Sequence, residues 1–192
     1  MDSDPIARFK QLLNEAEQLG IRPHNAAAFA TTGKELQPSV RMLLLKDIDE
    51  RGFVFYTNLQ SRKGRQLSDN PRASACFWWS QLARQVRIEG GIELVSDREA
   101  DVYFATRPRS SQIAAWASNQ SSEVSSRDEL IAAVESLTAK YHNQAVPRPP
   151  HWSGYRLVPE QIEFWKEQPD RLHEREVYTR QAEGWTVALL AP

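Results

Sequence analysis

The sequence predicts a mainly β protein, a closed or nearly closed antiparallel barrel decorated by α-helices. Strand-like runs follow one another through short polar turns, which implies antiparallel pairing of neighbours. More strand-like runs follow a helical stretch, and a barrel built from both groups leaves no free sheet edge. With 192 residues, 41% of them hydrophobic, the chain suits one such barrel as a single domain over residues 1–192.

The first half of the chain predicts one helix followed by a strand meander. The segment from Asp4 to Leu19 carries apolar residues at helical spacing, and Gly20 ends it. A short helix is expected at 61–69, capped by Ser61, in the middle of the meander. The expected strands span 27–32, 40–48, 52–58, 73–79 and 85–95.

The second half predicts three helices and then three strands. Ser96 to Glu99 fits a capping box and starts a helix that ends near Pro108. Two more helices are expected at 110–117 and 127–142. A proline-rich, stiff connector follows at 146–150. The last strands are expected at 154–158, 173–180 and 185–190.

Composition argues against several classes of partner. The net charge of -1 gives no reason to expect nucleic acid or an anionic membrane, and no apolar run approaches the roughly 20 residues that span a bilayer. The polar N-terminus lacks the pattern of a secretory signal, and Cys76 is the only cysteine. The four histidines lack metal-ligand spacing. We therefore expect a soluble, cytoplasmic protein without a metal site.

Two clusters of cations indicate bound anions. Arg171, His173 and Arg175 place two guanidiniums and an imidazole before a strand-like run, which suits a charged planar ligand. A solvated basic edge strand remains the alternative. Arg62 and Lys63 open the short helix, where free backbone N–H groups and the helix dipole favour a phosphate.

A second phosphate site is expected where two helices meet. Tyr103, Arg107 and Ser111 are spaced four apart, but Pro108 prevents one continuous helix, so a helix end meets a helix start. The alternative is a helix end with a solvated arginine.

Arg41 and Lys46 flank an apolar run. Strict strand alternation places their side chains on opposite faces of the strand, so they can share a binding site only at strand ends or around a bulge. The alternative is that both are simply charged residues at the ends of a strand. Gln120 and Ser121 offer hydrogen bonds to a heteroaromatic ring, or form an ordinary connector. Trp165 either stacks on a ring or packs in the core. Two phosphate sites without an obvious nucleophile suggest a phosphorylated cofactor that meets a phosphorylated small substrate.

Seven motifs together closely resemble the pyridoxine (pyridoxamine) 5'-phosphate oxidase family. They occur in the family's order and spacing, and the resemblance runs from Asp4 to Pro192. The motifs are R-M-L-L-L-K, F-Y-T-N-L-x-S-R-K, R-Q-V-R-I-E-G, Y-F-x-x-R-P-R-x-S-Q-I, S-x-Q-S-S, Q-I-E-F-W and R-L-H-E-R.

The resemblance implies a homodimeric flavoprotein of vitamin B6 metabolism. Its fold is the FMN-binding split barrel, with FMN between the subunits, and residues 150–192 form the C-terminal dimerisation and active-site segment. The implied reaction oxidises pyridoxine 5'-phosphate or pyridoxamine 5'-phosphate to pyridoxal 5'-phosphate by hydride transfer to flavin. Dioxygen is the electron acceptor and yields hydrogen peroxide.

The resemblance also assigns site residues, and Arg171 and His173 are the implied catalytic pair. The implied FMN contacts are Arg41, Met42, Leu43, Leu44, Leu45, Lys46, Tyr56, Thr57, Arg62, Lys63, Gln85, Gln120, Ser121, Trp165 and Arg175. The implied substrate contacts are Lys46, Tyr103, Arg107, Ser111, Arg171, Leu172 and His173.

The chain departs from the family pattern in its details. Glu174 replaces the usual aspartate of R-L-H-D-R, and Leu189 replaces a usual C-terminal arginine. Family members often carry a longer N-terminal arm. Two alternatives stay open: a phenazine-biosynthesis flavin oxidase, which shares the R-L-H-E-R spelling but has no phosphate to bind, and a non-catalytic flavin or pyridoxal-phosphate binding protein. The sequence does not fix the preference between the two vitamer phosphates.

Overall fold

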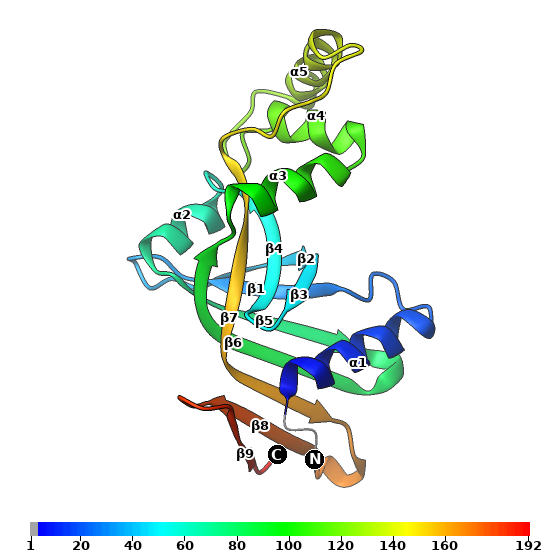
Figure 1. Ribbon diagram of the computed structural model, residues 1–192, viewed down its shortest axis with the longest axis vertical. Coiled ribbons are helices and arrows are strands. Elements are labelled where there is room, and N and C mark those ends of the chain that lie inside the picture. The colour runs from blue at the N-terminus through cyan, green and yellow to red at the C-terminus, as the bar shows by residue number, and fades with distance from the viewer. Residues whose placement is uncertain (1–3) are drawn as a thin grey trace.

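The computed structural model describes residues 4–192; the first three residues, part of the polar start discussed above, lie outside this range. The described chain forms one antiparallel sheet flanked by helices (Figure 1). Its strands are β1 Ala26–Thr31, β2 Ser39–Leu44, β3 Asp47–Asp49, β4 Gly52–Asn58, β5 Arg72–Trp79, β6 Arg84–Leu94, β7 Trp152–Lys166, β8 Glu174–Arg180 and β9 Trp185–Leu189. Its helices are α1 Pro5–Gln18, α2 Arg62–Asp69, α3 Asp97–Thr106, α4 Arg109–Ala117 and α5 Arg127–Lys140.

The sheet curls into a nearly closed barrel. The hydrogen-bonded order is β2-β1-β5-β6-β7-β4-β3, and β8 continues from β7 to β9. The chain itself joins the two ends of this order, because β2 runs into β3 through Leu45 and Lys46. There the Leu45 N–H donates to the Asn25 carbonyl, and the Lys46 N–H donates to the Val54 carbonyl. The predicted antiparallel barrel decorated by helices is confirmed.

The prediction of one strand at 40–48 is wrong, because the run divides at Leu45. Residues before Leu45 pair with β1, whereas those after Lys46 pair with β4. Leu45 turns into the core and is 3% exposed. Arg41 therefore lies in a strand paired with β1, whereas Lys46 lies next to β4. The two residues do not belong to one strand, so strand alternation does not fix which faces their side chains occupy.

The predicted strand at 154–158 is too short, because β7 continues to Lys166. Pro159 suggested a break, since proline cannot donate to a sheet ladder. The structure accommodates it at a bulge where Gly90 faces Pro159 and Glu160 is the extra residue. A Cβ on Gly90 would lie 2.0 Å from the Val158 carbonyl oxygen, so the close approach requires glycine.

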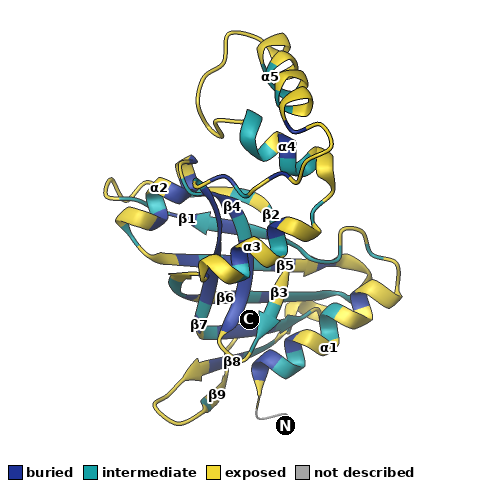
Figure 2. Ribbon diagram, turned by 45° about the horizontal axis from the view of Figure 1, so that its top comes forward, coloured by how far each residue is buried: buried dark blue, intermediate teal, exposed yellow. Residues whose placement is uncertain are grey.

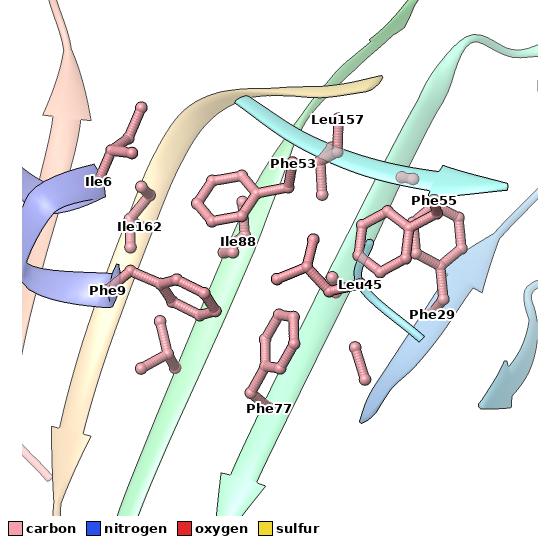
Figure 3. Packing of buried hydrophobic residues seen from close by; sticks show 14 of the residues in the cluster. Ile6, Phe9, Phe29, Leu45, Phe53, Phe55, Phe77, Ile88, Leu157 and Ile162 are labelled. Carbon is pink, nitrogen blue, oxygen red and sulfur yellow. The ribbon is translucent and has the colours of Figure 1, made fainter. Parts of the chain in front are cut away.

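The barrel core packs against α1. Figure 3 shows Phe9 of α1 pointing at aromatic side chains from the strands, with Ile6 beside Ile162. Phe9 is fully buried, and its ring lies 5.0 Å from Phe53 and 4.9 Å from Phe77 in edge-on geometry. Such buried aromatic pairs stabilise by both area and geometry. The helix is positioned by Asp4, whose carboxylate accepts from the Ile6 N–H at 2.9 Å.

The helices α3, α4 and α5 form a separate lobe beyond one end of the barrel (Figure 1). α3 ends at Thr106 and α4 begins at Arg109, which confirms the break at Pro108. A small cluster that includes Phe104, Ile113 and Trp152 joins this lobe to the start of β7. Much of α5 is exposed (Figure 2). Over residues 4–192, no helix is long and apolar enough to cross a membrane.

Candidate anion-binding cleft

The start of α2 holds a buried lysine. Ser61 caps the helix and accepts from the Gly64 N–H at 3.2 Å. Lys63 is 8% exposed, and its Nζ donates to Gln120 Oε1 at 2.6 Å, Thr57 Oγ1 at 3.0 Å and Ser61 Oγ at 3.2 Å. A Cβ on Gly64 would meet the Leu59 carbonyl oxygen at 2.0 Å, so only glycine allows this helix start to sit so close to the preceding turn.

Three cations gather around this helix start. Burial first, and then the nearby Arg41, lowers the pKa of Lys63 to about 8. Burial also lowers the pKa of Arg41, with Arg62 as the second cause. Within residues 4–192, none of these three cations forms an ion pair with a carboxylate. Lys63 is buried and Arg41 is half-buried, whereas Arg62 is exposed. Unpaired cations in buried positions are costly, so this cluster is suited to an anion.

A cleft of about 310 Å³ connects Lys63 with the junction between α3 and α4. It brings predicted FMN contacts and predicted substrate contacts into one space. Its lining residues are Leu43, Tyr56, Thr57, Asn58, Lys63, Arg107, Ser111, Ala114, Ala115, Ser118, Gln120 and Trp152.

Arg107 is the second cation of the cleft. Its Nη1 is buried and has no hydrogen-bond partner among residues 4–192, and burial lowers the pKa of the Arg107 guanidinium. Its guanidinium lies over the Trp152 ring, 4.7 Å from the centroid, and 5.6 Å from that of Phe104. An unpartnered guanidinium nitrogen in a cleft is a donor held ready for an anionic oxygen.

Tyr56 lines the cleft, and Tyr103 stacks behind it without lining the cleft itself. Tyr103 stacks on Tyr56 with centroids 4.0 Å apart and an interplanar angle of 13°. Burial raises the pKa of both phenols, that of Tyr56 to about 12. Both are therefore neutral hydrogen-bond donors at physiological pH. Lys46, predicted to join this group, instead lines another hollow, with Lys10 and His24.

The remaining predicted FMN contacts gather on the outer face of the sheet. Gln85, Trp165 and Arg175 stand side by side in β6, β7 and β8 as registered partners. Arg175 is held by the buried Glu163, which accepts from Nε at 2.8 Å and from Nη2 at 3.1 Å. Glu163 also accepts from Arg87. This row lies at the end of β7 away from the cleft (Figure 1).

Of the predicted catalytic pair, His173 lies against the same outer face, and Arg171 lies in the turn between β7 and β8. The His173 ring lies 4.6 Å from the Trp165 ring, and its Nδ1 accepts from the Gln168 N–H at 3.2 Å. A neutral His173 therefore carries its proton on Nε2. Arg171 is exposed and has a φ of 60°, directly after Asp170 with a φ of 56°. Two consecutive left-handed non-glycine residues are strained, which is typical of functional segments.

Other predicted contacts are distributed by strand alternation. Leu43 lines the cleft and Leu45 enters the core, whereas Met42 and Leu44 are 62% and 41% exposed on the opposite face of β2. Ser121 lies in the loop after α4 with a φ of 71°. Leu172, between the two residues of the predicted catalytic pair, is 70% exposed.

Sequence reasoning missed two residues that shape these regions, Trp152 and Glu163. Both lie in β7 but outside the strand expected at 154–158, so the sequence offered no strand position for either residue. A carboxylate between apolar neighbours in Q-I-E-F-W was the available signal for Glu163, because a buried acid requires a cationic partner.

The nearly closed barrel and its cation-lined cleft define a split-barrel protein that binds anions. A family model described as Pyridoxamine 5'-phosphate oxidase matches residues 13–141. A second, described as Pyridoxine 5'-phosphate oxidase C-terminal dimerisation region, matches residues 152–192. The chain belongs to the pyridoxamine 5'-phosphate oxidase family, as the motifs indicated.

Curated relatives agree with this assignment. The pyridoxine/pyridoxamine 5'-phosphate oxidase of Myxococcus xanthus (strain DK1622) is 52% identical over 189 residues, 98% of this chain and 92% of that protein. The protein of the same name from Rhodospirillum rubrum is 52% identical over 196 residues, 100% of this chain and 98% of that protein.

Solved structures show the same fold. PhzG from Burkholderia lata 383, in complex with tetrahydrophenazine-1-carboxylic acid, has a TM-score of 0.94 at 35% identity and covers 99% of this chain and 93% of its own. A pyridoxamine 5'-phosphate oxidase-related, FMN binding protein from Nostoc punctiforme PCC 73102 has a TM-score of 0.77 at 16% identity, covering 97% and 96%. At the latter identity, the likeness shows the fold alone.

Proposed function

We propose that this protein is an FMN-dependent oxidase that converts pyridoxine 5'-phosphate or pyridoxamine 5'-phosphate to pyridoxal 5'-phosphate. The observation that carries the proposal is the cleft between Lys63 and Arg107. It holds two cationic groups that have no carboxylate partner among residues 4–192. One cation suits the phosphate of the cofactor and the other suits the phosphate of the substrate.

The residues around α2 fit FMN. Arg62 and Lys63 at the helix start hold the phosphate, assisted by backbone N–H groups and the helix dipole. Arg41 adds positive charge, while its own guanidinium is held by Thr31 Oγ1 at 2.7 Å and Ser39 Oγ at 2.6 Å. FMN, when bound, accepts hydride from the substrate and passes the electrons to dioxygen, giving hydrogen peroxide.

Protein groups bind and orient the substrate. Arg107 and Ser111 hold its phosphate, with the Tyr103 hydroxyl as a further donor. Lys46 belongs to the same proposed set. Positioning is the contribution of these residues, because a ring held at the correct distance and angle reacts faster.

We further propose that each complete site uses two copies of the chain. His173 lies on the outer sheet face with Trp165, Arg171 lies in the turn just before it, and neither lines the cleft of its own protomer. In a homodimer, this face of one subunit covers the cleft of the other, so that FMN lies between them. The segment 150–192 then supplies both dimer contacts and the catalytic pair, within a single domain over residues 1–192. The match to a dimerisation region at residues 152–192 supports this arrangement.

The test is an anaerobic titration of the FMN-loaded protein. Either vitamer phosphate is added without oxygen, and the flavin absorbance near its visible maximum is followed. We expect bleaching with at least one phosphate, recovery on admitting air, and one hydrogen peroxide formed per pyridoxal 5'-phosphate. A flavin that stays oxidised with both phosphates contradicts the proposal and favours a non-catalytic binding protein.

One specific observation favours a second candidate, a phenazine-biosynthesis flavin oxidase. The structure resembles PhzG with a TM-score of 0.94. The same anaerobic experiment with a reduced phenazine carboxylate separates the two functions. A phenazine carboxylate carries no phosphate for the set proposed to bind one, Tyr103, Arg107 and Ser111, so we expect no bleaching with it.

A further inference from the structure

Trp152 lies beneath the arginine proposed to bind the substrate phosphate. The Arg107 guanidinium is centred 4.7 Å above the Trp152 ring, within the range of a cation–π contact. Trp152 is only 6% exposed, so this contact is shielded from water. Nη1 of Arg107 is buried and has no hydrogen-bond partner in the described part of the chain. The stacked arginine thus keeps a donor unused within its own chain.

The ring beneath Arg107 is itself held in place. Trp152 is nearly parallel to Tyr56, with centroids 5.2 Å apart and an interplanar angle of 6°. Tyr103 is parallel to both rings, and Phe104 packs edge-on against Trp152 at 5.0 Å. Gly154 faces Tyr56 across the strand pair and leaves room for its ring, since a Cβ there would lie 2.8 Å from it.

We propose that Trp152 is a positioning residue for phosphate recognition: it fixes Arg107 by a cation–π contact so that the free guanidinium donor meets the substrate phosphate. This inference rests on the proposed function, because it assigns the cleft at Arg107 to the substrate phosphate. The contact lowers the conformational entropy that a long arginine side chain loses on binding. Tryptophan offers the strongest such contact among the aromatic residues.

The test compares ligands that differ only in the phosphate. Calorimetric titration of the FMN-loaded protein uses pyridoxal 5'-phosphate and pyridoxal, which avoids turnover. In Trp152→Leu, we expect affinity for pyridoxal 5'-phosphate to fall roughly 5- to 30-fold, while affinity for pyridoxal and FMN content stay unchanged. Trp152→Phe keeps an aromatic face and should lose less. Equal losses for both ligands indicate a merely structural role and overturn the proposal.

Trp116 provides a matched control in the same cluster. Its indole N–H donates to the Pro147 carbonyl at 2.7 Å, and its ring packs near Tyr141. It does not line the cleft. Trp116→Leu should lower the melting temperature and leave the ratio of the two affinities as in the wild type. If it changes this ratio as much as Trp152→Leu does, the effect comes from loosening the lobe and the proposal fails.

A double-mutant cycle tests whether Trp152 acts through Arg107. If it does, the double variant with Trp152→Leu and Arg107→Met binds pyridoxal 5'-phosphate no more weakly than Arg107→Met alone. If the fold-losses in affinity of the two single variants multiply in the double variant, Trp152 acts independently of Arg107, and the proposal is contradicted. Failure of the proposed function looks different: the wild type itself would then bind pyridoxal 5'-phosphate no more tightly than pyridoxal.

Discussion

Glu163 and Arg175 form a two-point ion pair in which Glu163 Oε1 accepts from Nε at 2.8 Å and Oε2 accepts from Nη2 at 3.1 Å. Glu163 is 3% exposed and also accepts from Arg87. Two guanidiniums thus share one buried carboxylate. Such a pair fixes the direction of Arg175, because an arginine fork matches a carboxylate in one geometry.

We predict that Glu163→Gln lowers the free energy of unfolding by about 1.5–3 kcal/mol, since it removes the charge from buried hydrogen bonds. It should also weaken FMN binding, through a less ordered Arg175. Chemical denaturation and FMN titration measure the two effects. Glu160→Gln is the control, because Glu160 pairs with Arg72 at an exposed site on the same strand and should cost under about 1 kcal/mol. An equal loss of unfolding free energy in both variants would contradict the distinction between the buried pair at Glu163 and the exposed pair at Glu160.

Arg107→Met should weaken binding of the vitamer phosphates about 10- to 150-fold, because a charge-assisted hydrogen bond contributes roughly 1.5 to 3 kcal/mol. FMN content should stay nearly unchanged, since Lys63 and Arg62 are proposed for that phosphate. Anaerobic titration and the flavin absorbance of the purified variant measure both quantities. Loss of FMN with normal substrate affinity would reverse our division of the two phosphate sites.

Replacing Arg171 or His173 with Ala should lower the rate of flavin reduction in single-turnover experiments more than it weakens FMN binding. The reason is orientation: these side chains are proposed to hold the substrate ring, and the chemistry depends on its placement. Stopped-flow absorbance measures the rate. Wild-type reduction rates in both variants would support the alternative of a solvated basic edge.

Capping residues, cations and prolines in the sequence predicted the elements around the cleft more accurately than the alternation of apolar residues predicted the strands. The helix start at Arg62 and Lys63 was predicted from a capping serine and two cations, and the break at Pro108 from proline sterics. Both depend on neighbours in sequence. Leu45 was misassigned because its N–H bonds to the Asn25 carbonyl, a contact that no local pattern contains.

The rest of the site depends on contacts between distant segments. The sequence alone indicates only that Trp152 is an aromatic core residue; its contact with Arg107 appears only in the folded structure. Pro159 reads as a strand end until Gly90 opposes it at a bulge. His173 does not line the cleft of its own protomer, so its proposed place in the site requires a second copy of the chain. Only the family resemblance indicated a second subunit.

FMN affinity should depend on pH through Lys63. Its pKa is lowered to about 8, chiefly by burial, and the phosphate binds the protonated form. Above pH 8, binding must therefore take up a proton, and affinity should fall toward a limit of about tenfold per pH unit; below pH 8 this dependence disappears. Titration of the FMN-free protein between pH 7 and about 9 measures it. Lys63→Arg keeps the charge without titrating and should flatten the curve.

FMN should stabilise the dimer as well as the fold, because it is proposed to lie between the subunits with its phosphate on Arg62 and Lys63. A ligand that binds only the native state at a hundredfold excess over Kd adds about 2.7 kcal/mol. Saturating FMN should therefore raise the melting temperature, and riboflavin, which lacks the phosphate, should raise it much less. Replacing Arg62 and Lys63 together by Ala should abolish this difference while circular dichroism stays unchanged. Sedimentation with and without FMN tests the assembly directly: a monomer in both conditions, or equal stabilisation by riboflavin, would rule the proposal out.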